Sequence, residues 1–476
     1  MADDRRRSER KPTCPARGRD LAALVRGSLP RERLAQLRAA ARVARRLGVP
    51  AYLVGGSVRD LLLGAPSPDL DLTIVGDGLA FARALAAELG APVDEDRRFL
   101  TAKITAPQGA IDVATARRET YTRPGALPRV TPGGIEDDLA RRDFTVNAMA
   151  LRLDARGAPA VIDPFGGCAD LTRSRLRVLH HGSFVDDPTR LLRAARYAAR
   201  LGFSLQPGTR RLAAQAVRAG CLETVSGDRI RRELMMLLDE VRAWRGVTLL
   251  ARLGVLRYLH PALGVGPRTA RSLRSAGQLC AWLSRTAADA NANCAVVRLL
   301  IVVRLLIIAD GLRPVEAAAL AERLRLTAAQ RRALVDYARV KRRVRRALSS
   351  AQASNSAIVR ALGGLSQEGV LALGATSSPL VRRRCKLLLG RLKGLRARVT
   401  GEDLARLGYA PGPAWGRALA AARDARLDGR ARTKAQELRV AGAILRGGPQ
   451  APKRLSAQGR RVPRPDSVGP GWRSKT

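Results

Sequence analysis

The stretch GGSVRDLLLGAPSPDLDL, at residues 55–72, decides how this chain is interpreted. Its opening glycines, Gly55 and Gly56, lack side chains, so backbone N–H groups can approach a phosphate, and Arg59 adds positive charge. Asp69 and Asp71 are spaced by one residue, so in an extended strand both carboxylates share one face while leucines occupy the other. Such a pair can hold Mg²⁺, which prefers oxygen ligands and keeps positions open for substrate phosphates. The stretch therefore predicts nucleotidyl transfer.

Four further blocks follow in order: RRDFTVNAM at 141–149, DPFGG at 163–167, DDPTRLLRAARYAARLGF at 186–203 and SGDRIRREL at 226–234. Together with the opening stretch they resemble the class II tRNA nucleotidyltransferase and bacterial poly(A) polymerase family, part of the polymerase-beta-like superfamily. The resemblance implies an α+β fold. Its head is a mixed sheet with helices, and an all-helical neck, body and tail follow.

The chain is long enough for several domains, because single cores rarely grow past about 250 to 300 residues. We expect a disordered basic N-terminus at 1–29, the nucleotidyltransferase head at 30–170 and a helical neck for base recognition at 171–245. A helical body and tail that binds tRNA follows at 246–446, and a disordered basic tail at 447–476.

Hydrophobic periodicity places elements within these segments. The pattern predicts helices at about 30–47, 79–89, 247–256, 295–312, 315–324 and 328–348, and strands at 51–54, 102–105 and 110–114. Residues 120–134 contain three prolines and three glycines, which favours a loop that moves over the site.

Further site residues lie in the head. Asp112 is on a predicted strand and is our candidate for a third carboxylate, the alternative being a surface residue at a strand end. Arg142 can bind a triphosphate, and Asp143 with Asn147 offers an acceptor and a donor to a ribose 2′-hydroxyl. The ribose role is implied by the resemblance alone; without it, Arg142 and Asp143 form an ordinary ion pair.

The neck block suggests how a base is chosen. Asp187 and Arg190 are three apart on a predicted helix, and Arg193 and Arg196 follow one turn each. A carboxylate accepts from the exocyclic amine of cytosine or adenine, and a guanidinium donates to the adjacent ring nitrogen; uracil and guanine present the reverse polarity. The alternative is that Asp187 with its proline is only a helix N-cap and Arg190 is solvated.

Two positions depart from the family pattern. Asp186 and Asp228 stand where the family usually has glutamate, which leaves the fine placement of the nucleotide open. The block around Asp228 is predicted to be structural, with Arg229 and Glu233 four apart on one helix.

The composition fits an RNA partner. The formal charge is +45, from 86 Lys and Arg against 41 Asp and Glu, and basic proteins attract polyphosphates. A coding bias toward arginine and alanine explains part of this excess. The six cysteines are scattered with no C-x-x-C pair, which argues against a zinc site or a disulfide framework, and no membrane signal is present. We therefore expect a cytoplasmic location.

The resulting hypothesis is that an RNA 3′-hydroxyl attacks the α-phosphate of CTP or ATP and pyrophosphate leaves. Asp69 and Asp71 hold Mg²⁺, and Asp112 assists the hydroxyl. The triphosphate is contacted by Gly56, Arg59 and Arg142. The product is the tRNA 3′ end, made by full CCA addition or by addition of only CC or only A. A poly(A) polymerase and a noncatalytic RNA-binding protein are the rival interpretations, and the sequence does not determine the oligomeric state.

Overall fold

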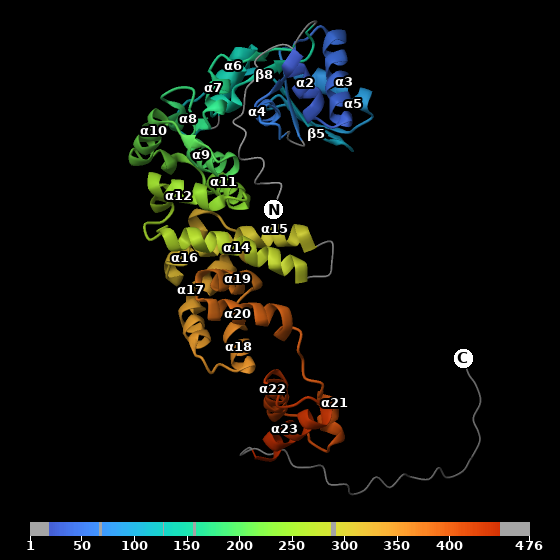
Figure 1. Cartoon of the computed structure of the whole chain (residues 1–476), viewed down its shortest axis with the longest axis vertical. Coiled ribbons are helices and arrows are strands. Elements are labelled where there is room, and N and C mark those ends of the chain that lie inside the picture. Colours follow the sequence, from blue (N-terminus) through green and yellow to red (C-terminus); the bar gives the residue numbers. More distant parts are fainter. Residues whose placement is uncertain (1–18, 66–68, 127, 156–158, 287–291, 448–476) are drawn as a thin grey trace, which may run out of the picture. The chain divides into compact units, whose positions relative to one another are not determined.

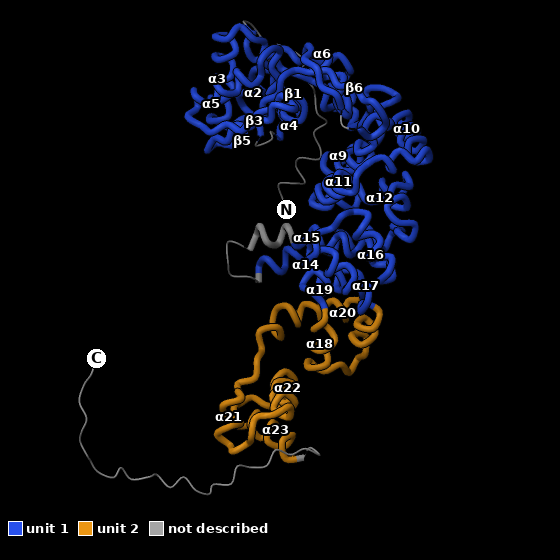
Figure 2. Tube along the Cα trace, turned by 180° about the vertical axis from the view of Figure 1, so that it is seen from behind, with its two compact units in different colours: residues 1–341, 365–377 blue, residues 342–364, 378–476 orange. Residues whose placement is uncertain are grey.

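The computed structural model describes residues 19–65, 69–126, 128–155, 159–286 and 292–447. It divides into two compact units (Figure 2). The first consists of Met1–Lys341 with Leu365–Ser377 and contains a sheet followed by helices. The second consists of Arg342–Gly364 with Ser378–Thr476, and its described elements are helices.

The sheet of the first unit has seven strands in the order β3-β4-β5-β2-β1-β8-β9. The strands are β1 (Ala51–Val54), β2 (Leu70–Ile74), β3 (Val93–Asp96), β4 (Thr101–Ala106), β5 (Gly109–Thr115), β8 (Ala150–Arg152) and β9 (Val161–Ile162). Strands β2 and β5 pair in parallel and the others pair antiparallel, which confirms the predicted mixed sheet. The strands predicted at 51–54, 102–105 and 110–114 correspond to β1, β4 and β5.

Helices α5 (Gly78–Leu89) and α3 (Arg31–Leu47) lie on one face of this sheet, and the candidate site lies on the opposite face. Helix α5 packs on β4 and β5, and α3 packs on α5 and β1 (Figure 1). Strand alternation explains the division, because Leu70 and Leu72 are buried on either side of the more accessible Asp71. Helix α4 (Gly56–Leu62) joins β1 to the segment that leads into β2.

The predicted loop at 120–134 is partly wrong. It contains β7 (Arg129–Pro132), which pairs antiparallel with β6 (Arg117–Thr120). Gly125 lies between these strands with φ +70°, and its backbone N–H donates to the Asp186 carbonyl (3.1 Å). The segment is therefore tied to the chain just before the neck helix rather than fully irregular.

Helices dominate the rest of the chain. They are α6 (Ile135–Ala140), η1 (Thr145–Asn147), α7 (Gly167–Thr172), α8 (Ser183–Asp186), α9 (Arg190–Leu201), α10 (Pro207–Arg218), η2 (Cys221–Thr224), α11 (Gly227–Asp239), α12 (Ala243–Leu253), α13 (Val255–Leu259), α14 (Pro267–Thr286), α15 (Ala292–Ile308), α16 (Pro314–Arg323), α17 (Ala328–Ser349), α18 (Asn355–Leu362), α19 (Gln367–Thr376), α20 (Pro379–Leu387), a π-helical turn η3 (Leu388–Leu392), α21 (Gly401–Arg406), α22 (Pro413–Leu427) and α23 (Lys434–Gly447). The predicted helix at 247–256 is divided by Gly254, which has φ +86°.

Two predictions about order and helicity need correction. Residues 19–29 are not disordered, because α2 (Arg19–Ser28) forms there and Leu21 at its start is fully buried; residues 1–18 and 448–476 lie outside the described residues. The predicted all-helical neck also contains a short parallel pair, β10 (Arg175–Leu176) with β11 (Ser204–Leu205).

Two buried cations, Arg304 and Lys341, satisfy backbone carbonyls at or just after the ends of helices. Arg304 of α15 donates to the carbonyls of Leu238 and Glu240 at the end of α11. Lys341 of α17 donates to the Asp310 and Leu312 carbonyls after α15 in the same way. The last carbonyls of a helix have no intrahelical partner, so Arg304 satisfies those at the end of α11 and complements the negative end of its dipole.

Two further expectations can be compared with the structure. Among the described residues, no helix combines the length and hydrophobicity that crossing a membrane requires. Among the described residues, Cys221, Cys280 and Cys385 are free and buried.

Candidate active site

A cavity of about 1170 Å³ lies between the uncovered face of the sheet and helix α9. Eleven of the thirteen predicted site residues line it: Gly56, Arg59, Asp69, Asp71, Asp112, Arg142, Asp143, Asn147, Asp187, Arg190 and Arg193. Gly55 and Arg196 do not. The fold therefore brings residues that are up to 137 positions apart in the sequence to one cavity.

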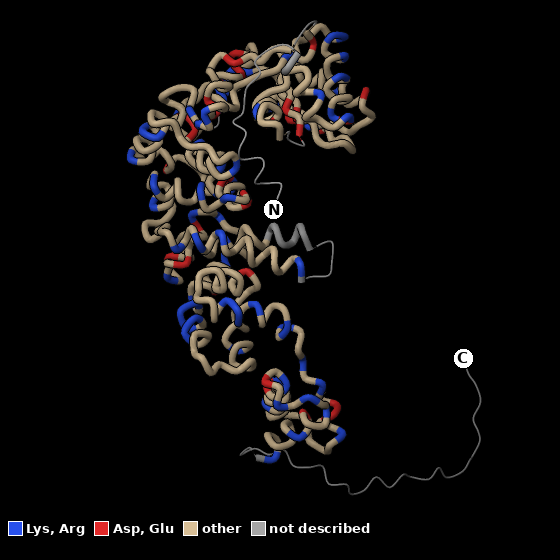
Figure 3. The backbone as a smooth tube through the Cα atoms, in the orientation of Figure 1, with Lys and Arg blue, Asp and Glu red and all other residues tan. Residues whose placement is uncertain are grey.

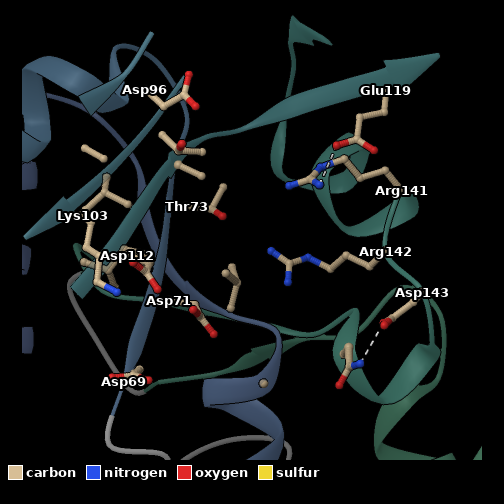
Figure 4. Close-up of a pocket in the computed structure, with 18 of the residues that line it drawn as sticks. Asp69, Asp71, Thr73, Asp96, Lys103, Asp112, Glu119, Arg141, Arg142 and Asp143 are labelled. Carbon is tan, nitrogen blue, oxygen red and sulfur yellow. Dashed lines mark hydrogen bonds and ion pairs between the residues drawn. The ribbon is translucent and has the colours of Figure 1, made fainter. Parts of the chain in front are cut away.

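Three carboxylates gather on the sheet side of this cavity. Asp71 of β2 and Asp112 of β5 are partners in the parallel register, and Asp69 lies directly before β2 (Figure 4). Asp71 Oδ2 accepts a hydrogen bond from the Ser57 hydroxyl (3.2 Å). Burial raises the pKa of Asp71; the Ser57 hydroxyl and Arg142 lower it, and Asp112 and Asp69 raise it. The negative charges therefore destabilise one another.

This donor set fits a divalent cation. Mg²⁺ prefers oxygen ligands, which the carboxylates provide. The ion would also relieve the repulsion between these carboxylates by neutralising their charge. Among the residues that the structure describes, no three His, Cys, Asp or Glu side chains converge tightly enough to enclose a metal alone. Substrate phosphates and water would complete the coordination, as Mg²⁺ sites commonly require.

The glycine pair makes room rather than presenting both amides. Gly55 has φ +65°, and its N–H donates to the Met149 carbonyl (3.0 Å). A Cβ at Gly55 would overlap the Arg142 guanidinium, and one at Gly56 would lie 3.8 Å from Asp71 Oδ2. Glycine is therefore required at position 55, where φ is positive and Arg142 approaches closely, whereas a Cβ at position 56 would make only ordinary van der Waals contacts.

Arg142 is held in place by a residue that sequence reasoning missed. Its Nη2 donates to Asp138 Oδ2 (2.8 Å), and Arg141 Nη2 donates to Asp138 Oδ1 (2.6 Å). Asp138 is completely buried. Burial alone would raise the pKa of Asp138, but the two arginines outweigh burial and lower it. The simple ion pair between Arg142 and Asp143 does not form. The available signal was the spacing of four between Asp138 in α6 and Arg142, which lies two residues after that helix ends.

Arg59 is more enclosed than the motif suggests. Only 2% of its surface is exposed, its Nε donates to Asp60 Oδ1 (2.7 Å) and its Nη1 donates to Asn147 Oδ1 (2.5 Å). Its guanidinium also lies over the Tyr197 ring, 5.3 Å from the centroid. Arg59 therefore connects α4 to η1 and α9 while it lines the cavity.

Asp143 and Asn147 contact each other. Asn147 Nδ2 donates to Asp143 Oδ1 (2.8 Å), and Arg193 Nη2 lies 2.6 Å from Asp143 Oδ2. Burial alone would raise the pKa of Asp143, but Arg193 and Asn147 lower it to about 2. Arg193 also pairs with Glu233 of α11, as does Arg196, which does not line the cavity.

The two candidate base-reading residues are each anchored on one side. Asp187 Oδ1 accepts from the Thr189 N–H (3.1 Å) and hydroxyl and from Arg229 Nη2 (2.8 Å). Arg190 is buried and donates to Ser183 and to the Arg141 carbonyl (2.7 Å). The N-cap interpretation is wrong, because α9 begins at Arg190 with Thr189 in the N-cap position, so Asp187 lies before the helix and Arg190 is not solvated. Asp187 Oδ2 receives no hydrogen bond from the described residues.

Arg229 departs from its predicted role. It was expected to pair with Glu233 along one helix, but it donates to Asp187 and to the Gly125 carbonyl (2.8 Å) instead. Glu233 is occupied by the two arginines of α9. Arg229 therefore joins the hairpin loop and the base-reading candidate to α11.

Comparison with known proteins supports this arrangement. The family model "Poly A polymerase head domain" matches residues 51–177, and "Probable RNA and SrmB-binding site of polymerase A" matches residues 202–265. An A-adding tRNA nucleotidyltransferase from Geobacter sulfurreducens is 37% identical over 434 residues, which is 90% of this chain and 49% of that protein. The chain therefore spans about half the length of that relative.

Two further comparisons extend over whole proteins. A CC-adding tRNA nucleotidyltransferase from Deinococcus radiodurans is 34% identical over 84% of this chain and 90% of its own length. The solved structure of a CCA-adding enzyme in an apo form is 30% identical, covers 89% of this chain and 99% of its own, and has a TM-score of 0.78. The likeness therefore includes the sheet and the helices that follow.

Proposed function

Because this chain belongs to the tRNA nucleotidyltransferase and poly(A) polymerase family, we propose that it transfers CMP, AMP or both from CTP and ATP to the 3′ end of tRNA. The observation that carries the proposal is one cavity whose wall combines the carboxylates Asp69, Asp71 and Asp112 with Arg142 and Asp187. Nothing in this constellation requires a nucleic-acid template. The acceptor hydroxyl would attack the α-phosphate, and pyrophosphate would leave.

Each side chain has a role that its position supports. Arg142 faces Asp71 across the cavity and would bind the triphosphate, with Asp138 fixing its orientation (Figure 4). Asp112 would orient or deprotonate the attacking hydroxyl. Asp69 and Asp71 would hold Mg²⁺, which supplies charge neutralisation for the phosphates when it is bound. Catalysis would then consist mainly of positioning and electrostatic stabilisation.

Base choice would belong to the neck. Asp187 retains Oδ2 as an acceptor, and Arg190 uses three of the five N–H groups of its guanidinium on Ser183 and Arg141. The remaining groups match the exocyclic amine and ring nitrogen of cytosine or adenine. Arg193, Asp143 and the rest of their network would hold this reader against the head rather than touch the base.

The helices after the neck would bind tRNA by charge and shape. Residues 379–398 include eight Lys and Arg and no Asp or Glu, and blue segments recur along these helices in Figure 3. Phosphate contacts of this kind position an RNA without reading its sequence. On this basis we retain the head at 30–170, the neck at 171–245 and the body and tail at 246–446, together with a cytoplasmic location, as proposals.

The direct test is extension of three tRNA transcripts that end before CCA, after C and after CC. CTP and ATP are supplied separately and together with Mg²⁺, and products are resolved by single nucleotides. Growth that stops at CCA identifies a full enzyme; growth that stops at CC, or addition of only the final A, identifies a partial one. Long adenosine tracts on unrelated RNA would identify a poly(A) polymerase, and tight binding without extension would overturn the catalytic proposal.

The matched variant is Asp71→Ala. Loss of this carboxylate should lower incorporation by about 10³-fold or more, because several kcal/mol of charge stabilisation would be lost. Binding of tRNA should change little, since Asp71 lies at the reaction centre and not on the helices. Incorporation close to that of the unmodified protein would refute the assignment.

A further inference from the structure

One cation that lines the cavity has no partner among the described residues. Eight Lys and Arg side chains line the cavity, and the seven arginines each have a carboxylate or carbonyl oxygen within 4.0 Å. Lys103 is the exception: it forms no hydrogen bond or ion pair with the described residues. A charged amine beside several carboxylates that still pairs with none of them is available for an anion that arrives with a substrate.

The strand fixes where Lys103 points. Strand β4 alternates, so Ala102, Ile104 and Ala106 are buried toward α5 while Lys103 is exposed on the cavity face. Lys103 is the register partner of Asp112, which places their Cα atoms about 5 Å apart. Figure 4 shows Lys103 on the side of Asp112 and Asp69, with Arg142 across the cavity.

The positions of Arg142 and Lys103 suit two different phosphate groups, the triphosphate of the nucleotide and a backbone phosphate of the acceptor RNA. In an in-line displacement the attacking and leaving oxygens lie on opposite sides of the phosphorus. The leaving pyrophosphate belongs with Arg142, so the attacking hydroxyl belongs near Asp112, on the far side of Asp71. The nucleotide that carries this hydroxyl also carries its own 5′-phosphate one sugar away, next to the strand on which Lys103 lies.

We propose that Lys103 binds the last phosphodiester of the acceptor RNA, the one that links its final two nucleotides. The inference rests on the proposed function for the direction of attack. Lys103 is a positioning residue for the acceptor strand. It offsets the repulsion that Asp112 and its neighbours exert on an incoming phosphate, and it sets the distance from the terminal hydroxyl to the nucleotide.

The test combines a protein variant with a modified RNA. A tRNA ending in CC is made with a neutral methylphosphonate at its last linkage, and a second tRNA carries the same change three linkages earlier. Lys103→Ala is compared with Lys103→Arg, which keeps the charge, and with Arg45→Ala, which removes an exposed charge on α3 outside the cavity.

Lys103→Ala should raise the KM for tRNA roughly 10-fold, the size expected for one charge-assisted hydrogen bond, and leave the KM for ATP unchanged. The terminal methylphosphonate should impair the unmodified protein and Lys103→Arg, and it should have no further effect on Lys103→Ala. An equal methylphosphonate penalty in Lys103→Ala, or a rise in the KM for ATP instead, would overturn the proposal.

A binding measurement separates this inference from the proposed function. If the unmodified protein extends no tRNA, the proposed function fails, and fluorescence anisotropy without nucleotide still compares the two modified RNAs. The contact would be supported if the unmodified protein bound the unmodified tRNA more tightly than the tRNA with the terminal methylphosphonate, and if Lys103→Ala did not show this difference. Equal binding of all three RNAs, or no binding of any, would overturn it.

Discussion

Arg193 of α9 and Asp143, which precedes η1, form an ion pair in which Arg193 Nη2 lies 2.6 Å from Asp143 Oδ2. Asp143 in turn accepts from Asn147, and Asn147 accepts from Arg59 at the start of the nucleotide motif. The pair therefore connects the helix that carries the base-reading candidates to the head that carries the carboxylates. A buried pair of this kind is costly to break, because removal of one partner leaves the other charged and desolvated.

This ion pair predicts a particular response to acid. The folded-state pKa of Asp143 is about 2, below its ordinary unfolded value of about 3.9. Its contribution is thus fully present above about pH 4 and is lost as pH falls through about 2. The pair should contribute about 2–3 kcal/mol to the free energy of unfolding above pH 4. Urea unfolding at pH 5, 4, 3 and 2 measures this quantity in the unmodified protein and in Arg193→Met.

The difference between these two proteins should be large at pH 5 and shrink toward pH 2. Arg406→Met provides a control, because Arg406 is exposed and its ion-pair partners among the described residues, Glu402 and Asp403, lie on its own helix. A difference between the unmodified protein and Arg193→Met that does not vary with pH would contradict the assigned pKa.

Asp138 is predicted to position the triphosphate arginine. Asp138→Asn should weaken the hold on Arg142, so the KM for ATP or CTP should rise about 10-fold, consistent with loss of a charge-assisted hydrogen bond. The KM for tRNA should stay constant, which a general loss of structure would not produce. Glu136→Gln on the exposed side of the same helix is the matched control. An equal rise in both KM values would show that Asp138 is only structural.

Base choice gives a third prediction. Asp187→Ala removes the free acceptor Oδ2, so misincorporation of UMP and GMP relative to CMP and AMP should rise by about 10-fold or more, because one mismatched hydrogen-bond pattern is worth about 1–3 kcal/mol. Arg229→Ala breaks only the contact of Arg229 with Asp187 Oδ1 and with the Gly125 carbonyl. Arg229→Ala should therefore lower the rate of incorporation of all four nucleotides by similar factors. Competition assays with paired nucleotides measure both ratios, and unchanged discrimination in Asp187→Ala would exclude Asp187 as a base reader.

The sequence predicted the parts of the site that follow from local geometry. Strand alternation placed Asp69 and Asp71 on one face, because the period of two is a property of the backbone, and a second predicted strand supplied Asp112 as the candidate third carboxylate. The partner of each arginine could not be predicted in this way. Arg229 has two candidate carboxylates, one four residues away and one forty-two, and the fold selects the distant one. Lys103 was missed because its interest lies in having no partner, which only the packed cavity reveals.

The buried cations give the last prediction, which concerns stability. Arg304 satisfies the carbonyls of Leu238 and Glu240 from inside an apolar helix. Arg304→Met keeps the volume and removes the donors, so two partly enclosed carbonyls lose their partner. The free energy of unfolding should fall by about 2–3 kcal/mol, because an unsatisfied buried acceptor costs about 1–3 kcal/mol. Arg252→Met on the exposed side of α12 should change stability by only about 0.5 kcal/mol. Chemical unfolding of both variants at pH 7 provides the comparison, and equal stabilities would show that the carbonyls find water or another donor when Arg304 is absent.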